Sequence, residues 1–132
     1  MAYGNLLTDV VQSSTTNTPP VFKDGNGTEV GTLCRAWVNI NGASGASPTI
    51  RASFNVSSVT RNSTGSYTVT FTNAMPDTNY AFVFGRAAGG ASRTIYQEEG
   101  ASGALTTTSI RLNTATSSAL DDVVIGNMAI FR

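Results

Sequence analysis

Short runs in which every second residue is apolar set the tightest limit on how this chain can fold. From residue 66 to residue 73, Tyr67, Val69 and Phe71 alternate with threonines. A period of two places neighbouring side chains on opposite faces of a β-strand. Glycines and clusters of Ser, Thr and Asn punctuate these runs as turns, and no long run has the period of a helix. We therefore predict an all-β protein.

The pattern predicts about eight strands, drawn from nine short segments of the chain. They fall within residues 21–23, 28–30, 33–40, 49–60, 66–73, 80–86, 92–97, 104–112 and 123–131, the first two forming a short hairpin. Because the segments follow one another through turns without helices between them, neighbours are expected to pair antiparallel. We predict an antiparallel β-sandwich, jelly-roll-like, over residues 21–132.

Two of these segments carry more specific predictions. Residues 49–60 are expected to form one continuous strand that pairs in a hairpin with residues 66–73. One face of that strand is expected to carry Ile50, Ala52, Phe54 and Val56. Residues 80–84 are apolar at every position, which indicates either a central strand covered on both faces or a strand covered by another subunit.

Residues 1–20 differ from the rest of the chain. The stretch from Gln12 to Pro20 is polar, lacks an apolar period and ends in two prolines, which favour extended backbone. We predict an extended N-terminal arm that acts as a tether or as a segment interlocking subunits. Its apolar residues, expected to dock on the parent domain or on a neighbouring chain, are Leu6, Leu7, Val10 and Val11.

Composition excludes several classes of function. Ser, Thr and Asn supply 44 of the 132 residues, charged residues are 12% and the formal net charge is +0. Without a basic excess the chain has no electrostatic basis for binding nucleic acid. No apolar run approaches the ~20 residues that a membrane-spanning helix needs, so we expect no membrane insertion. The N-terminus lacks the charged and apolar regions of a secretory signal, and we expect synthesis in a cytoplasm.

The residues that usually carry chemistry are few. The chain has no histidine, the commonest general base, and its single cysteine, Cys34, falls in an expected core strand. The turn Asp24–Gly27 lacks further calcium ligands, and the adjacent Asp121 and Asp122 point to opposite sides of an extended chain. We predict no catalytic residues, no metal site and no cofactor, and a protein that is not an enzyme.

The basic residues favour contacts between proteins. Seven of the eight are arginine, which is preferred where a charge is partly desolvated and hydrogen-bonds in a fixed geometry. Four of them lie in expected strands, where they either extend into solvent from the outer face of the sandwich or form subunit contacts. These four are Arg35, Arg51, Arg86 and Arg111.

Aromatic rings suggest a second kind of contact, because a sugar ring stacks on an aromatic face. The candidates are Trp37, Tyr80 and Tyr96. Trp37 lies in an expected core strand and is predicted to be buried. Tyr96, beside Gln97, is predicted to be exposed and is the candidate contact for a glycan.

Three blocks follow one another between residues 34 and 80. They are Cys34–Gly42 (CRAWVNING), Ile50–Val59 (IRASFNVSSV) and Gly65–Tyr80 (GSYTVTFTNAMPDTNY). In content and order they resemble a β module that recurs in virion proteins of tailed bacteriophages and prophages, many of which are labelled tail-fibre or virion structural proteins. The resemblance covers over a third of the chain and carries no catalytic motif.

The resemblance implies a non-enzymatic structural protein, located in the virion and assembled in several copies, with a homotrimer expected. Because the module begins near the N-terminus, we expect a standalone small virion protein attached through residues 1–20. Two positions remain open: a tail-fibre or receptor-binding tip used in host attachment, or a capsid decoration (cement) protein on the head shell. The expected partners are further copies of itself, tail or major capsid protein, and a host surface glycan.

Overall fold

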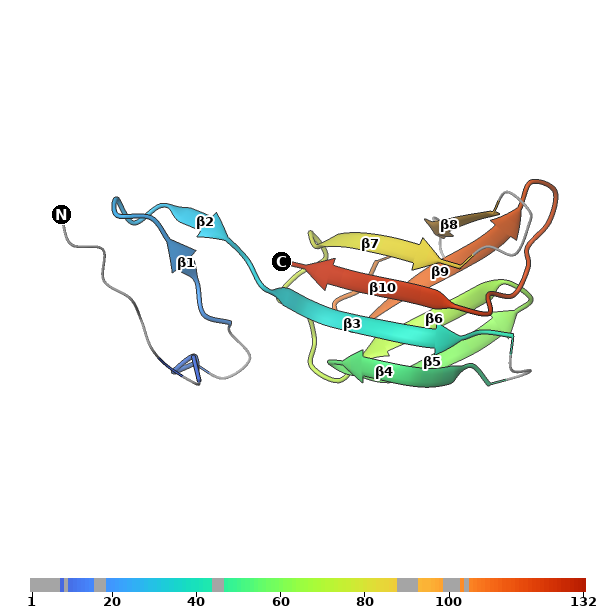
Figure 1. Ribbon diagram of the computed structural model, residues 1–132, viewed down its shortest axis with the longest axis horizontal. Coiled ribbons are helices and arrows are strands. Elements are labelled where there is room, and N and C mark those ends of the chain that lie inside the picture. The colour runs from blue at the N-terminus through green and yellow to red at the C-terminus, as the bar shows by residue number, and fades with distance from the viewer. Residues whose placement is uncertain are drawn as a thin grey trace. The chain divides into compact units, whose positions relative to one another are not determined.

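The computed structural model describes residues 8, 10–15, 19–43, 47–87, 93–98, 103 and 105–132. The chain divides into two units, residues 1–33 and residues 34–132. The described residues form strands and turns and contain no helix (Figure 1). The all-β prediction is therefore confirmed.

In the described part of the first unit, β1 (Phe22–Lys23) pairs with β2 (Glu29–Gly31) as a short hairpin. The carboxylate of Asp24 holds the turn by accepting the backbone N–H groups of Asn26 and Thr28, each at 2.9 Å. The sequence placed this hairpin with the sandwich, whereas in the structure it belongs to the N-terminal unit.

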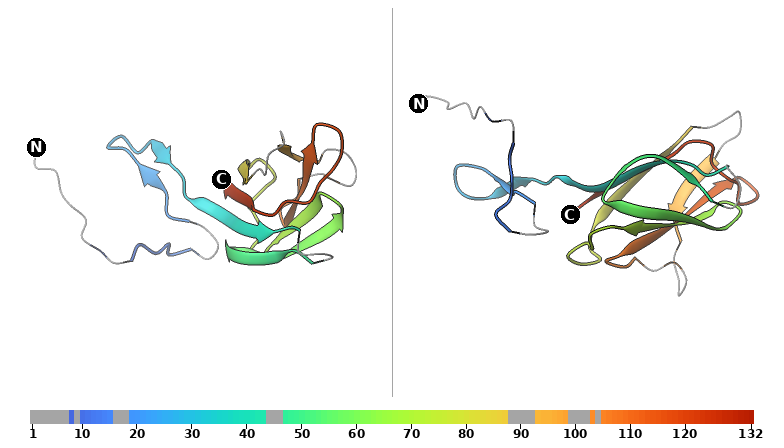
Figure 2. Two further views of the ribbon diagram at one scale, coloured as in Figure 1. Left: turned by 45° about the vertical axis from the view of Figure 1, so that its right-hand side comes forward. Right: turned by 90° about the horizontal axis from the view of Figure 1, so that it is seen from below.

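The second unit is an antiparallel β-sandwich of two four-stranded sheets (Figures 1 and 2). The first sheet, here called the Trp37 sheet, has the order β4-β3-β10-β7, and the second, the Tyr67 sheet, has the order β5-β6-β9-β8. The strands are β3 (Cys34–Asn41), β4 (Thr49–Phe54), β5 (Val56–Ser63), β6 (Ser66–Phe71), β7 (Ala81–Arg86), β8 (Arg93–Gln97), β9 (Ser109–Thr116) and β10 (Gly126–Phe131). Every neighbouring pair is antiparallel, so the predicted sandwich of about eight strands is confirmed.

The inner faces of the two sheets form the hydrophobic core. In β6, Tyr67, Val69 and Phe71 all point inward, at 1%, 0% and 5% exposure, as their alternation with threonines predicted. The ring of Phe71 meets the ring of Tyr80 edge-on, with centroids 6.1 Å apart. The Trp37 sheet contributes Ala36, Val38, Ile40, Met128 and Ile130 from the opposite side.

The prediction of one strand over residues 49–60 is wrong, because the chain changes sheets at Asn55. Asn55 has a φ of 55°, a left-handed conformation that ends β4 and directs the chain into β5 of the other sheet. A bulge at Arg51 also inverts the alternation within β4, so Ile50 packs against the core while Phe54 is 55% exposed. The hairpin with residues 66–73 is formed by β5 alone.

Hydrogen bonds made by the Asn55 side chain hold this corner. Its amide donates to the carbonyl oxygens of Arg35 and Asn73 at 3.0 and 3.1 Å, and its own oxygen accepts the backbone N–H of Asn73 at 2.7 Å. Asparagine tolerates left-handed backbone better than other residues with a side chain. The corner therefore needs both the backbone freedom and the amide of this residue.

Two further expectations are corrected. The strand expected over residues 104–112 begins at Ser109, because the hydroxyl of Thr106 accepts the backbone N–H groups of Thr108 and Ser109 and forms a turn there. The strand that follows Tyr80 is β7, which lies at the edge of the Trp37 sheet. Of the two alternatives for residues 80–84, the central strand is excluded and coverage by another subunit remains a prediction.

Replacing Asn55 by alanine is expected to destabilise the sandwich by about 2–3 kcal/mol, since it removes three hydrogen bonds and puts a residue that tolerates left-handed backbone less well than asparagine at this corner. Asn55→Gly relieves the backbone strain but also loses the amide, and should cost less. Urea denaturation of the wild type and the two variants measures the difference from their midpoints, provided that the unfolding free energy depends on urea concentration with the same slope in all three. An unchanged midpoint for Asn55→Ala would show that the corner does not depend on this side chain.

Candidate functional site

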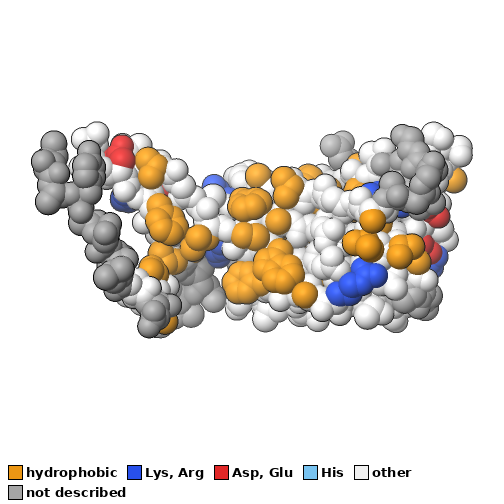
Figure 3. Space-filling model, in the orientation of Figure 1, with side chains coloured by type: hydrophobic (Ala, Val, Ile, Leu, Met, Phe, Trp, Pro, Cys, Tyr) orange, Lys and Arg blue, Asp and Glu red, His pale blue; other side chains and the backbone are white. Residues whose placement is uncertain are grey.

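An apolar row crosses the outer face of the Trp37 sheet. In the strand register, Val83 of β7 lies opposite Ala129 of β10, Ala129 lies opposite Trp37 of β3, and Trp37 lies opposite Phe54 of β4. Phe54 and Val83 are 55% and 58% exposed, Trp37 is 38% exposed and Ala129 is half-buried. Figure 3 shows hydrophobic side chains gathered on this sheet, where β3 begins and β10 ends. These four residues are called the apolar row below.

A polar row lies beside it, one outward position further along the strands. Asn39 lies opposite Asn127, and the Asn39 amide donates to the Asn127 side-chain oxygen. Arg51 donates to the Asn39 side-chain oxygen at 3.3 Å and to the carbonyl oxygens of Ile40 and Val124 at 2.7 and 2.9 Å. The polar groups next to the apolar row are therefore largely paired with one another.

The outer face of the other sheet has a different character. Its cross-strand rows are Ser58–Thr70–Ser109 and Thr60–Thr68–Arg111. Hydroxyl groups dominate there, in keeping with a chain that is one third Ser, Thr and Asn. The apolar row is thus a property of one sheet and not of the whole surface.

The expectation that Trp37 is buried is wrong. Its neighbours Ala36 and Val38 occupy the inner face of β3, at 0% and 3% exposure, so the intervening Trp37 points outward. The other two aromatic candidates differ from each other. Tyr80 is 4% exposed and its hydroxyl donates to the carbonyl oxygen of Thr106 at 3.0 Å, whereas Tyr96 of β8 is 43% exposed.

The four arginines proposed as contacts lie in different surroundings. Arg51 extends over the outer face of the Trp37 sheet. Arg111 lies on the outer face of the Tyr67 sheet, 2.7 Å from the Glu98 carboxylate. Arg35 is half-buried.

Arg86 was expected on the outer face and is instead turned inward. Its register partner Gly126 faces the side chains of Ile40 and Val123, and the three guanidinium nitrogens of Arg86 are buried. The outward expectation failed because Gly85, next to Arg86, takes the outer position in β7 opposite Asn127.

The structure describes two of the four apolar residues predicted as contacts in the arm. Val10 and Val11 are 71% and 60% exposed, and Leu6 and Leu7 lie outside the described residues. Sequence reasoning named none of Phe54, Val83 and Ala129 as contact residues. The sequence did indicate an outward apolar residue near Val83, because residues 80–84 are apolar on both faces of their strand. Phe54 was expected on the same face as Ile50, whereas it points to the opposite one.

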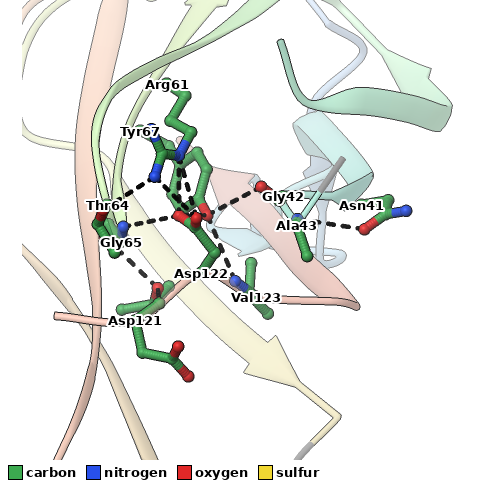
Figure 4. Close-up of polar contacts among 11 residues, drawn as sticks. Asn41, Gly42, Ala43, Arg61, Thr64, Gly65, Tyr67, Asp121, Asp122 and Val123 are labelled. Carbon is green, nitrogen blue, oxygen red and sulfur yellow. Dashed lines mark hydrogen bonds and ion pairs between the residues drawn. The ribbon is translucent and has the colours of Figure 1, made fainter. Parts of the chain in front are cut away.

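A second polar cluster centres on Asp122, at the loop that leads into β10 (Figure 4). Arg61 donates through Nε at 3.0 Å and through a terminal nitrogen at 2.8 Å, forming a two-pronged ion pair with the carboxylate. The Tyr67 hydroxyl and the backbone N–H of Gly65 donate to the same carboxylate at 2.7 and 2.8 Å. Asp122 thereby ties the loop to the β5–β6 hairpin.

The proton affinities of this cluster indicate a structural role. The hydrogen bond from Arg61 lowers the pKa of Asp122 to about 2, and burial raises the pKa of Tyr67. Neither group exchanges a proton near neutral pH, as a general acid or base would need to do.

Gly65 is required at its turn because it has a φ of 69° and a Cβ there would lie 2.5 Å from the carbonyl oxygen of Thr114.

Among the described residues, no three Cys, Asp or Glu side chains gather to hold a metal ion. Within the same residues there is no helix long and apolar enough to cross a membrane. Comparisons with protein-family models, with curated proteins and with solved structures found no match. The apolar row therefore has to be interpreted from its own geometry.

Asp122→Asn is expected to lose about 2 kcal/mol of stability at pH 7, because the folded state lowers the carboxyl pKa from 3.8 to about 2. When folding lowers a carboxyl pKa, the ionised group stabilises the folded state at every pH above its unfolded-state pKa. This contribution to stability is lost as the pH falls through the folded-state pKa. The wild type and the variant should therefore converge in stability between about pH 4 and pH 2. Urea unfolding across this pH range measures the effect.

Asp77→Asn is the matched control. Asp77 forms an ion pair with Arg132 at 2.6 Å, but both side chains are exposed and solvent screens the pair. Its replacement should change stability much less than Asp122→Asn does. Equal losses in the two variants would contradict the structural role assigned to the Asp122 cluster.

Proposed function

We propose that this chain is a non-enzymatic structural protein of a tailed-bacteriophage virion, a small oligomeric β module displayed on the particle surface. Within the particle we favour a tail-fibre or receptor-binding tip component. A decoration protein on the capsid shell is the alternative. The proposal takes a homotrimer as the assembly, and tail or major capsid protein as the neighbour in the particle.

The resemblance to virion proteins supports the proposal through the module that it covers. Its first block covers β3, its second covers β4 from Ile50 onward and the first half of β5, and its third contains β6 and the loop to β7. These strands come from both sheets and include the corner at Asn55. The resemblance therefore concerns a structural unit that contributes to the core of the sandwich.

One observation carries the proposal: the N-terminal unit has no buried residue among those described, yet it exposes large apolar side chains. An isolated two-stranded hairpin is at best marginally stable in water. A segment of this kind gains stability when another surface covers it, as expected of an anchor or an interlocking arm. The exposed side chains are Val10, Val11, Val21, Phe22, Val30 and Leu33, at 40–71% exposure.

Deletion of residues 1–20 should leave a folded sandwich that no longer joins particles, because the core lies wholly within residues 34–132. Purified particles from cells that supply only the truncated chain are assayed for its presence by mass spectrometry. Circular dichroism of the purified truncated chain checks its fold. Normal incorporation of the truncated chain would contradict an anchoring role for residues 1–20.

The number of copies in a particle distinguishes the two positions. A copy number in proportion to the major capsid protein indicates a shell decoration protein. A small number in proportion to the tail indicates a fibre or tip. Absence from purified particles that are otherwise complete would refute the proposed function in both forms.

Host-glycan binding is a second candidate, favoured by exposed aromatic rings on both sheets. Tyr96 is 43% exposed on the Tyr67 sheet and Trp37 is 38% exposed on the other. Titration with host surface glycans, followed by nuclear magnetic resonance or calorimetry, tests it. Tyr96→Ala should abolish the response if Tyr96 is the contact, and no response from the wild type would count against glycan binding.

A further inference from the structure

The apolar surface of the Trp37 sheet extends beyond the apolar row. Beside it, on the side away from the polar row, the outward positions are Ala81 of β7 and Phe131 of β10, which lie opposite each other. Apolar side chains thus occupy two successive outward rows at one end of the sheet. The inner face of the same sheet is apolar as well, since it forms half of the core.

Apolar side chains occupy outward positions of the Trp37 sheet at which polar side chains would be expected. On the outer face of the Tyr67 sheet, by contrast, the rows across β5, β6 and β9 consist of Ser and Thr side chains and Arg111, so those strands face outward without tryptophan or phenylalanine. The edge strand β7 contributes to this surface as well, because it presents Val83 at 58% exposure. The apolar row is therefore expected to be covered in the assembled protein.

We propose that copies of this chain pack against one another through the outer face of the Trp37 sheet, with Trp37 at the centre of the contact. This deepens the proposed function, on which it rests, by naming the surface that makes the β module oligomeric. The surface is distinct from the N-terminal unit that anchors the protein to the particle.

Charge favours a second copy as the occupant. The apolar row contains no ionisable group, and Arg51, beyond it, is hydrogen-bonded to three acceptors. Two such faces can meet without burying an unpaired charge. Burial of an unpaired charge is strongly unfavourable. The chain has eight acidic and eight basic residues, so its copies have little net repulsion.

The composition of the row also fits a protein partner better than a sugar. Tryptophan is among the side chains most enriched at the energetic centres of protein interfaces. A sugar would need free hydrogen-bonding groups beside the ring. The amides in the next outward row, on Asn39 and Asn127, are bonded to each other, and Asn39 also to Arg51.

The size of the face indicates how strong the contact is. With strands about 4.8 Å apart and outward positions about 7 Å apart, the four positions of the apolar row and the two beside it cover on the order of 200 Å². A standard interface buries about 800 Å² on each partner, so this face supplies less than half of a stable one. Its copies are expected to associate through it together with other surface, and a single charge within it should weaken the whole assembly.

Trp37 itself reports on the contact, because it is the one tryptophan of the chain. The full-length protein is diluted over a wide concentration range, and acrylamide quenching of Trp37 is measured beside the mass from sedimentation velocity. Quenching should fall as the oligomer forms, because the partner copy covers the ring. Native mass spectrometry then gives the number of copies.

Val83→Glu is the test variant, because it places a charge in the apolar row and leaves the reporter intact. Thr60→Glu is the matched control, since it adds the same charge to the outer face of the other sheet's edge strand, β5. Val83→Glu should raise the dissociation constant at least tenfold and keep Trp37 accessible, whereas Thr60→Glu should match the wild type. Circular dichroism melting shows whether each variant is folded.

A third variant covers the case in which Val83→Glu fails to fold. Trp37→Ala removes an outward-facing side chain and should raise the dissociation constant about 30-fold, as expected for the loss of a central interface tryptophan. Sedimentation velocity alone is its readout, because the reporter is lost.

Three results would overturn the proposal. The first is an oligomer in which Trp37 remains as accessible as in the monomer and Val83→Glu has no more effect than Thr60→Glu. The second is a full-length chain that stays monomeric at every concentration. The third is protection of Trp37 by a soluble host glycan with no association of the protein. None of them decides whether the chain is a virion protein, which the particle assay tests separately.

Discussion

The conformation of one residue, Asn55, determines how the two faces of this protein are composed. Its left-handed backbone ends β4 and starts β5 in the opposite sheet, so Phe54 points out of the sandwich while Val56 packs against its core. In an uninterrupted strand these two side chains would share a face. The amide of Asn55 stabilises the corner through bonds to the backbone of Arg35 and Asn73. Without this corner residues 50–59 could not contribute a strand to each of the two sheets.

The two sheets that meet at this corner differ in what they present to the outside. One shows rows of hydroxyls, and the other shows Trp37, Phe54 and Val83 beside asparagines that bond to each other. A solitary sandwich gains nothing from the second kind of surface, because exposed aromatic and branched side chains remain in contact with water. An assembly does gain from it, since burial between copies recovers that free energy. The same chain therefore combines a stable core with a surface suited to association.

The Asp122 cluster plays a different part, in which polar groups stabilise the fold without taking part in chemistry. Its carboxylate accepts from a guanidinium, a tyrosine hydroxyl and a backbone amide, and so stays ionised to low pH. Buried polar groups stabilise a structure only when their bonds are satisfied, and here each donor comes from the β5–β6 hairpin. The loop before β10 is thus fixed where Val123 enters the core, at 1% exposure.

The sequence alone determined that the protein is an all-β sandwich, because a period of two in apolar residues is a local property of the chain. It also determined which residues of β6 point inward, since nothing interrupts their alternation. Only the tertiary structure decided the outward direction of Trp37 and Phe54 and the inward direction of Arg86. A period of two says that a strand has two faces and does not say which of them meets the other sheet. That choice depends on a bulge at Arg51, a corner at Asn55 and the order of strands in the sheet, which arise from contacts between residues far apart in the chain.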